Sequence, residues 1–272
     1  MDRQPVLLQT YGAANAPKAV IGQAIDYVDG AHEIAHVHHR AQLVYALSGS
    51  VRVITPSGLW ALTPGSALLI GSRIEHELQM VGRVAMRTLY INPEALGGVL
   101  DECRVITVGQ LLNAAISAMF ETELDDEQGS KDTLLVPLIL RLLQQSDAHP
   151  QVGRLPLPAN PRLRSICTAL IQQPANNDTL ERWSERVHAS ARTLARLFRQ
   201  ETGMTFGQWR EELRLADALS RLTLGQSVSD VARELGYADV RTFTVMFKRA
   251  FGCTAQQFKA QVVSRSAEVS VV

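Results

Sequence analysis

Cationic side chains recur at helical spacing in the last hundred residues of the chain. Leu194, Leu197 and Phe198 lie at i, i+3 and i+4, which predicts one buried stripe of a short helix. The face opposite this stripe then carries Arg192, Ala195, Arg196 and Arg199. Guanidinium groups pair with guanine edges in the major groove of DNA or bind its phosphates. The chemistry indicated is therefore DNA binding.

A second segment repeats this pattern. Its inward-pointing side chains are predicted to be Phe243, Met246 and Phe247. The residues left available to DNA are Val240, Arg241, Thr242, Val245, Lys248 and Arg249. We expect Arg196 and Arg241 to contact bases, with phosphate contact as the alternative. Phosphate contacts are expected for Arg199, Lys248 and Arg249.

Each cationic helix is predicted to be the second helix of a helix-turn-helix unit. In the first unit, Leu180–Val187 precedes a turn at His188 and Ala189, and Ser190 caps a helix that ends at Gly203. In the second unit, a helix with Val228, Val231, Ala232 and Leu235 on one face ends at Gly236. Asp239 then caps a helix that runs to about Phe251.

One long helix is predicted between the two units, from Thr205 to Leu224. Its expected buried stripe consists of Phe206, Trp209, Leu213, Ala216 and Leu219. Twenty residues at about 1.5 Å each give a rod of about 30 Å. Successive major-groove segments on one side of DNA recur at roughly 34 Å, so this helix can hold two recognition helices in phase.

Residues 161–261 resemble the DNA-binding domain of the AraC/XylS family of bacterial transcription regulators. The phrases that carry the resemblance are Arg192-Thr-Leu-Ala-Arg-Leu-Phe-Arg-Gln-Glu-Thr-Gly203 and Val231-Ala-Arg-Glu-Leu-Gly-Tyr237. The resemblance implies that both recognition helices enter adjacent major-groove segments. It places Arg192, Ala195, Arg196, Arg241, Thr242 and Val245 at base-contacting positions. Trp183 stands where family members commonly have a smaller residue, which we interpret as repacking.

The amino-terminal part shows the pattern of short strands. Segments rich in Val, Ile, Leu and Tyr are separated by turn residues, and they are Gln42–Leu47, Val51–Thr55, Leu59–Leu62, Ala67–Ile70 and Val84–Ile91. Tight turns are predicted at Ser48-Gly49 and at Pro56-Ser57-Gly58. Many strands without intervening helices favour a small all-β barrel or sandwich.

Gly30, His36, His38, Gln42 and Gly49 match the first cupin motif at every spacing, with Gln42 in place of the usual Glu. His76 falls where the second motif places its histidine, although other positions of that motif are missing. Residues 20–92 thus resemble a cupin barrel, a fold that AraC/XylS members often carry as their effector-binding half.

Two interpretations of these four side chains remain open. Three imidazoles and an amide oxygen could hold a divalent transition metal. Alternatively, His36, His38, Gln42 and His76 are polar groups of an effector pocket or satisfy local hydrogen bonds, and no cofactor is required. We favour this second interpretation, because the missing carboxylate removes a charged ligand. His32 and His39 are expected at the surface.

The predicted fold is a cupin-like all-β barrel (1–105), an amphipathic helix pair (106–147), a Pro-rich linker (148–160), an all-α DNA-binding domain of about seven helices (161–263) and a tail (264–272). The helix pair spans Val108–Glu123 and Thr133–Gln145, with an acidic loop at Glu121–Glu127 and Gly129. Its apolar stripes favour packing within the chain over a dimer contact, although both can hold.

Charge separates the two halves of the chain. Residues 1–159 carry 11 Lys and Arg against 16 Asp and Glu, a net charge of −5, and residues 160–272 carry 16 against 11, a net charge of +5. Only the second half is expected to meet a polyanion. Three scattered cysteines, no apparent signal peptide and no long apolar run predict a cytoplasmic protein that does not enter a membrane.

The sequence thus predicts a transcription regulator rather than an enzyme. The expected partners are double-stranded DNA, a small-molecule effector, a second copy of the chain and, for an activator, RNA polymerase. The alternative is a metal-dependent cupin oxygenase or isomerase with an unrelated helical domain. That alternative leaves the matched helix-turn-helix units unexplained, and it offers no evident general base beyond the histidines.

Overall fold

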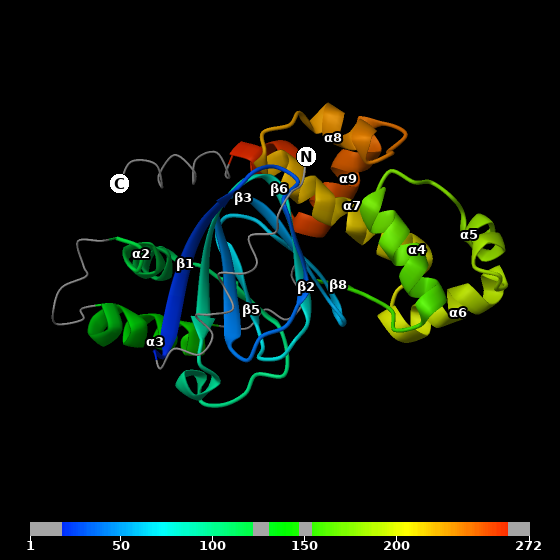
Figure 1. Ribbon diagram of the computed structural model, residues 1–272. Helices are drawn as coiled ribbons and strands as arrows, with labels where there is room; N and C mark the ends of the chain where they lie inside the picture. Colours follow the sequence, from blue (N-terminus) through cyan, green and yellow to red (C-terminus); the bar gives the residue numbers. More distant parts are fainter. Residues whose placement is uncertain (1–17, 122–130, 147–153, 261–272) are drawn as a thin grey trace, which may run out of the picture. The chain divides into compact units, whose positions relative to one another are not determined.

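The computed structural model describes residues 18–121, 131–146 and 154–260 (Figure 1). The chain forms two compact units. One consists of residues 1–55 and 62–152, and the other of residues 56–61 and 153–272. The predicted tail, most of the acidic loop and the first part of the predicted linker lie outside the described residues.

The first unit is built on an antiparallel sheet in which β6 (His76–Ile91) is central. This strand pairs with β1 (Val20–Tyr27), β2 (His32–His36) and β3 (Ala41–Thr55). Strand β3 also pairs with β5 (Ser66–Ile70), which in turn pairs with β7 (Arg104–Thr107). Along β6 buried and half-buried side chains alternate, as expected for a strand with one face on the core. The predicted strand-rich domain followed by a helical domain is confirmed.

The turn predicted at Ser48-Gly49 is wrong, because these residues lie within strand β3. The register with β6 shifts between Ala46 and Ser48 and again between Ser48 and Ser50, so the irregularity is a bulge. Gly49 has φ +77°, and a Cβ there would lie 2.4 Å from the carbonyl oxygen of Arg83. Glycine adopts a positive φ in bulges and in turns alike, so the residue type alone did not distinguish the two.

Two helices cover an apolar face of this sheet. They are α2 (Gln110–Ala118) and α3 (Val136–Gln145), and a short 3-10 helix, η2 (Pro93–Leu96), follows β6. Ile116 and Ile139 are fully buried in the same core as Leu43 and Leu89. The predicted apolar stripes therefore pack within the chain. Leu111 and Leu134 remain exposed.

Both helices of the pair are shorter than predicted. Helix α2 begins at Gln110 and ends at Ala118. The segment Lys131–Leu135 (η4) is a π-helical turn, and α3 starts only at Val136. Pro137 explains this start, because proline lacks an N–H and fits best in the first turn of an α-helix.

The second unit holds the remaining helices and a small pair of strands. Strand β4 (Gly58–Leu62) pairs antiparallel with β8 (Arg154–Pro156), which lies within the predicted linker. The helices are α4 (Pro161–Gln172), α5 (Leu180–Arg186), α6 (Ala191–Thr202), α7 (Phe206–Thr223), α8 (Val228–Glu234) and α9 (Val240–Phe251). A further helical segment begins at residue 255. The indole N–H of Trp209 on α7 donates to the Pro156 carbonyl at 2.7 Å, which ties β8 to the helices.

Among the residues that the structure describes, no helix is long and apolar enough to cross a membrane.

Candidate functional site

Helix α6 is delimited by the residues that the sequence predicts. The hydroxyl of Ser190 accepts a hydrogen bond from the Thr193 N–H at 3.1 Å, and Gly203 ends the helix with φ +74°. Leu194 and Phe198 are fully buried. The Phe198 ring lies 5.5 Å from that of Phe206, at the start of α7. Packing on this side fixes which face of α6 is exposed.

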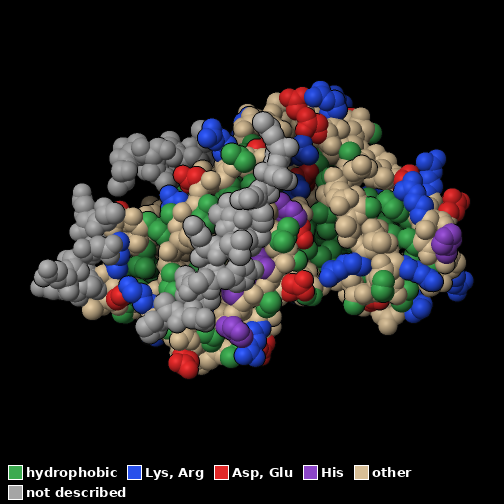
Figure 2. Space-filling model, viewed as in Figure 1, with side chains coloured by type: hydrophobic (Ala, Val, Ile, Leu, Met, Phe, Trp, Pro, Cys, Tyr) green, Lys and Arg blue, Asp and Glu red, His purple; other side chains and the backbone are tan. Residues whose placement is uncertain are grey.

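The opposite face of α6 carries the cations. The side chains that the structure leaves exposed there are Arg192, Ala195, Arg196 and Arg199. Arg196 donates to the Gln200 side chain at 3.0 Å, one turn along the same face. Lys and Arg side chains gather where α5 and α6 lie (Figure 2). No described acidic side chain forms an ion pair with Arg192, Arg196 or Arg199.

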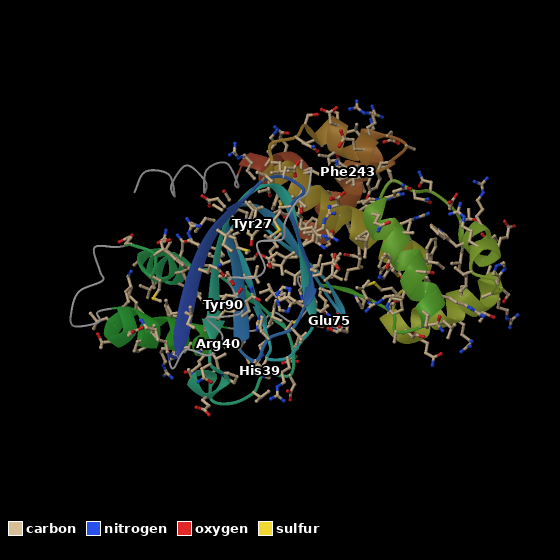
Figure 3. The ribbon with its side chains drawn as sticks, viewed as in Figure 1. Tyr27, His39, Arg40, Glu75, Tyr90 and Phe243 are labelled. Atoms are coloured by element: carbon tan, nitrogen blue, oxygen red, sulfur yellow. The ribbon has the colours of Figure 1, made fainter. Side chains whose placement is uncertain are left out.

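Helix α9 is built in the same way. The Asp239 carboxylate accepts hydrogen bonds from the N–H and hydroxyl of Thr242, at 2.8 and 2.9 Å. The Thr242 N–H holds the pKa of Asp239 below its usual value. Gly252 ends the helix with φ +72°. Phe243 (Figure 3) and Phe247 are fully buried.

The exposed face of α9 is part apolar and part cationic. All six predicted residues are exposed, namely Val240, Arg241, Thr242, Val245, Lys248 and Arg249. Val245 has 65% of its surface exposed, which is high for an aliphatic side chain in a folded unit. Arg249 is held by an ion pair to Glu211 on α7 at 2.9 Å. A phosphate contact by Arg249 would have to replace that pair.

Helix α7 lies between the two helix-turn-helix units in sequence and contacts both α6 and α8. Thr205 and Gln208 form a capping box at its start. The predicted stripe is only partly right: Phe206, Trp209 and Leu213 are buried, whereas Ala216 and Leu219 are half-buried. The helix is buried around more of its circumference than one stripe, because helices pack on several of its sides.

Two buried charged residues of α7 were missed by the sequence analysis. Arg214 donates to the carbonyl oxygens of Pro174 and Asn176 and to the Asn177 side chain, at 2.8 to 3.1 Å. Asp217 pairs with Arg221 at 3.0 Å, and Arg221 also pairs with Glu234 of α8. The only sequence signal was a charged residue on an otherwise apolar face. These contacts tie α7 to the α4–α5 connection and to α8.

Trp183, interpreted as repacking, is buried on α5. The Arg186 guanidinium lies 4.6 Å from the centre of its ring.

A histidine cluster forms in the first unit. One ring nitrogen from each of His36, His38 and His76 lies within 4.8 Å of the other two. The Gln42 amide oxygen lies 2.9 Å from Nε2 of His38 and 2.8 Å from Nε2 of His76. The four residues of the predicted site are thus brought together, from β2, the segment that follows it, β3 and the start of β6.

The other ring nitrogen of each histidine faces the backbone. Nδ1 lies 2.8 Å from the Ile34 carbonyl oxygen in His36, 2.7 Å from that of Arg40 in His38 and 2.8 Å from that of Ile74 in His76. Each partner is two residues away in sequence, so local backbone geometry fixes all three rings.

Thr88 and Tyr90 on β6 were not predicted to belong to this site. The Gln42 amide N–H donates to the Thr88 hydroxyl at 3.0 Å. The ring of Tyr90, which Figure 3 labels, meets the His38 ring edge-on, with centroids 5.2 Å apart. Both residues alternate with core residues on β6, a pattern that does not distinguish a site residue from a packing residue.

Burial sets the electrostatics of the cluster. His76 has 1% of its surface exposed, and this desolvation lowers its pKa to about 3. Burial likewise lowers the pKa of His38.

Other titratable groups of this unit lie outside the cluster. The Tyr27 hydroxyl donates to Glu33, and burial together with this neighbouring charge raises the pKa of Tyr27. His39 is exposed and His32 pairs with Glu77 at 2.9 Å, as expected of surface residues.

Two family models match the chain, one over its strand-rich part and the other over its helical part. The AraC-like ligand binding domain matches residues 18–144, which include the sheet, the histidine cluster and the helix pair. The helix-turn-helix domain matches residues 183–261. The chain belongs to the AraC family of transcription regulators. It combines the AraC-type ligand-binding domain with a helix-turn-helix DNA-binding domain.

Two relatives carry names that agree with this assignment, and one solved structure is also similar to the chain. The HTH-type transcriptional regulator NimR of Escherichia coli strain K12 is 29% identical over 231 residues, 85% of this chain and 84% of NimR. The HTH-type transcriptional regulator RipA of Corynebacterium glutamicum is 30% identical over 218 residues, 80% of this chain and 61% of RipA. The crystal structure of ToxT from Vibrio cholerae O395 matches 90% of this chain and 98% of ToxT, at 10% identity and a TM-score of 0.39.

Proposed function

We propose that this AraC-family regulator binds two successive major-groove segments of double-stranded DNA, one through α6 and one through α9. The observation that carries the proposal is the matched construction of the two helices. Each has a side-chain N-cap, a left-handed glycine at its end, two buried anchors and an exposed cationic face. Helix α7 joins the units, and its 18 residues give a rod of about 27 Å.

Side-chain chemistry divides the exposed residues of both helices by role. Arg196 and Arg241 contact base edges, because both side chains are exposed and a guanidinium can form bidentate bonds to guanine. Thr242 and Val245 add polar and methyl contacts, and Ala195 and Val240 allow close approach. Arg192 contacts a base or the adjoining phosphate. Arg199, Lys248 and Arg249 bind phosphates.

The strand-rich unit acts as a sensor and not as a catalyst. His36, His38, Gln42 and His76 form its polar centre, and a small-molecule effector binds there. The effector shifts the DNA-competent population by its different affinity for two states of the protein. The protein works in the cytoplasm as a homodimer through the exposed part of the helix pair, with RNA polymerase as a further partner if it activates. What supports this role is the family's ligand-binding domain over residues 18–144.

The test is a fluorescence-anisotropy titration of the full chain with DNA from upstream of its own gene. Arg196→Ala and Arg241→Ala should each weaken specific binding by about tenfold to a hundredfold, since each removes one base contact. Arg104→Ala, which removes an exposed cation from β7, is the matched control and should bind normally. Normal affinity in both α6 and α9 variants would refute the assignment.

A further inference from the structure

The segment that leads into the first helix-turn-helix unit contacts the second unit directly. Residues 174–177 connect α4 to α5, and residues 236–237 lie between α8 and α9. The Asn177 amide N–H donates to the Gly236 carbonyl oxygen at 3.3 Å. Gly236 has φ +75°, and a Cβ there would lie 2.7 Å from the Ala175 carbonyl oxygen. The backbones of the two segments therefore lie against each other, beside the joining helix α7.

Arg214 on α7 holds the first of these segments. Its guanidinium donates to the carbonyl oxygens of Pro174 and Asn176, at 2.8 and 3.1 Å, and to the Asn177 amide oxygen at 2.9 Å. Only 8% of Arg214 is exposed, so these acceptors take the place of water. The donors of a guanidinium have a fixed planar arrangement, so three acceptors bound to it are held in fixed positions.

The same guanidinium also contacts the second helix-turn-helix unit. Its central carbon lies 5.7 Å from the centre of the Tyr237 ring, a cation–π contact. The Tyr237 ring meets the Phe243 ring edge-on, with centroids 5.3 Å apart. Phe243, labelled in Figure 3, is a fully buried anchor of α9. One arginine is thus in contact with the segment before α5 and with the residues that hold α9.

Asn177 can bridge the two segments because an amide both donates and accepts. Its oxygen accepts from Arg214, and its NH₂ donates to Gly236. A guanidinium only donates and a carbonyl oxygen only accepts, so a single orientation of the amide satisfies both partners. An aspartate at this position would still accept from Arg214 but would have no hydrogen to donate to Gly236.

We propose that Arg214 and Asn177 are positioning residues that fix the spacing and the angle between α6 and α9. The inference rests on the proposed binding of two successive DNA segments. Helix α7 sets the distance between the helix-turn-helix units, whereas a contact beside α7 also opposes their rotation relative to each other. The protein therefore accepts one spacing of its two DNA segments and discriminates against others.

The experiment compares two duplexes in anisotropy titrations of the full chain. One is the DNA that wild type binds, and the other has one base pair inserted between the two contacted segments. The insertion moves one segment by about 3.4 Å and turns it by about 34° relative to the other. The insertion penalty is the ratio of the two affinities. For wild type it should be about tenfold or more, since a rigid protein loses base contacts on the longer duplex.

Variants of Asn177 should lower this penalty. Asn177→Ala should reduce it by about twofold to tenfold, the range of one hydrogen bond. Asn177→Asp should also reduce it, because the bond to Gly236 is lost although the carboxylate still accepts from Arg214. Asn176→Ala is the matched control. The printed side-chain contacts of Asn176 are to the adjacent Asp178, so the penalty should keep its wild-type value.

This measurement separates positioning from stability. Both affinities come from the same protein sample, so a variant that is only less stable leaves their ratio unchanged. Asn177 is exposed, so its variants are expected to fold. Arg214→Lys keeps the charge but not the planar arrangement of donors, and it should lower the penalty as well.

Three results would overturn the inference. They are an unchanged penalty in Asn177→Ala, an equal reduction in Asn176→Ala, and specific binding by wild type with no penalty for the insertion. Each of them leaves DNA binding by the protein in place. The absence of specific DNA binding by wild type would instead refute the proposed function.

Discussion

Arg249 differs from the other cations of helices α6 and α9 because it already forms an ion pair within the protein. Its guanidinium lies 2.9 Å from the Glu211 carboxylate, and 71% of the arginine side chain is nevertheless exposed. An exposed ion pair contributes little to stability, so the arginine can exchange Glu211 for a phosphate. Glu211 lies on α7, where it reduces the positive potential of the α9 face.

Removing the Glu211 partner of Arg249 should raise the affinity for DNA. Glu211→Gln removes the competing carboxylate and one negative charge near the DNA, so affinity should rise by about twofold to fivefold, the range of an exposed ion pair. Arg249→Ala should cancel the gain, and this double variant is the control. The measurement is an anisotropy titration at fixed salt. Unchanged or weaker binding by Glu211→Gln would show that Arg249 does not contact phosphate.

Capping residues determine where helices α6 and α9 begin and end. Ser190 and Asp239 each accept a hydrogen bond from the N–H three residues on, and a left-handed glycine ends each helix. These groups act through local backbone geometry, so the sequence predicted both helices correctly. The bulge at Gly49 was not predictable in this way, because it depends on the pairing of β3 with β6, which is distant in sequence.

The same distinction applies to the candidate sites. The exposed residues of α6 and α9 follow from a 3.6-residue period and two buried apolar anchors per helix, which are local properties. Arg214 was missed because its three acceptors belong to the α4–α5 connection. Thr88 was missed because its role depends on the register between β3 and β6, which places it opposite Val44. Motif spacing indicated the histidines and Gln42 but gave no hydrogen-bond geometry.

Loss of the N-cap of helix α6 should measurably lower the free energy of unfolding. Ser190→Ala removes the acceptor for the Thr193 N–H, and the free energy of unfolding should fall by about 1 kcal/mol. Ser190→Asp keeps an acceptor at the N-terminus and should restore most of this loss. Urea unfolding followed by circular dichroism provides the comparison. Equal midpoints for Ser190→Ala and wild type would mean that the cap does not stabilise α6.

At the scale of the whole molecule, charge is divided unevenly along the chain. The halves before and after Asn160 carry −5 and +5, although the net charge is zero. Six cations lie on the exposed faces of α6 and α9: Arg192, Arg196, Arg199, Arg241, Lys248 and Arg249. We expect the acidic half to limit non-specific adsorption and the cationic faces to account for the attraction to DNA.

Salt dependence follows from this distribution. If all six cations displace counterions, the logarithm of the association constant should fall with the logarithm of salt concentration at a slope of about −5 for each chain bound. Replacing Lys248 with Ala should reduce the magnitude of the slope by about 1. Titrations at several potassium chloride concentrations give this value. A slope near zero is incompatible with phosphate contacts from these helices.

The most direct test of the central claim is missing-base interference on the DNA that the protein binds. If α6 and α9 enter successive major-groove segments, wild type should give two clusters of interfering bases about 10 base pairs apart on one face of the duplex. Arg196→Ala should remove interference in one cluster only, and Arg241→Ala in the other only. A single cluster, or two clusters that respond identically to both substitutions, would contradict the account.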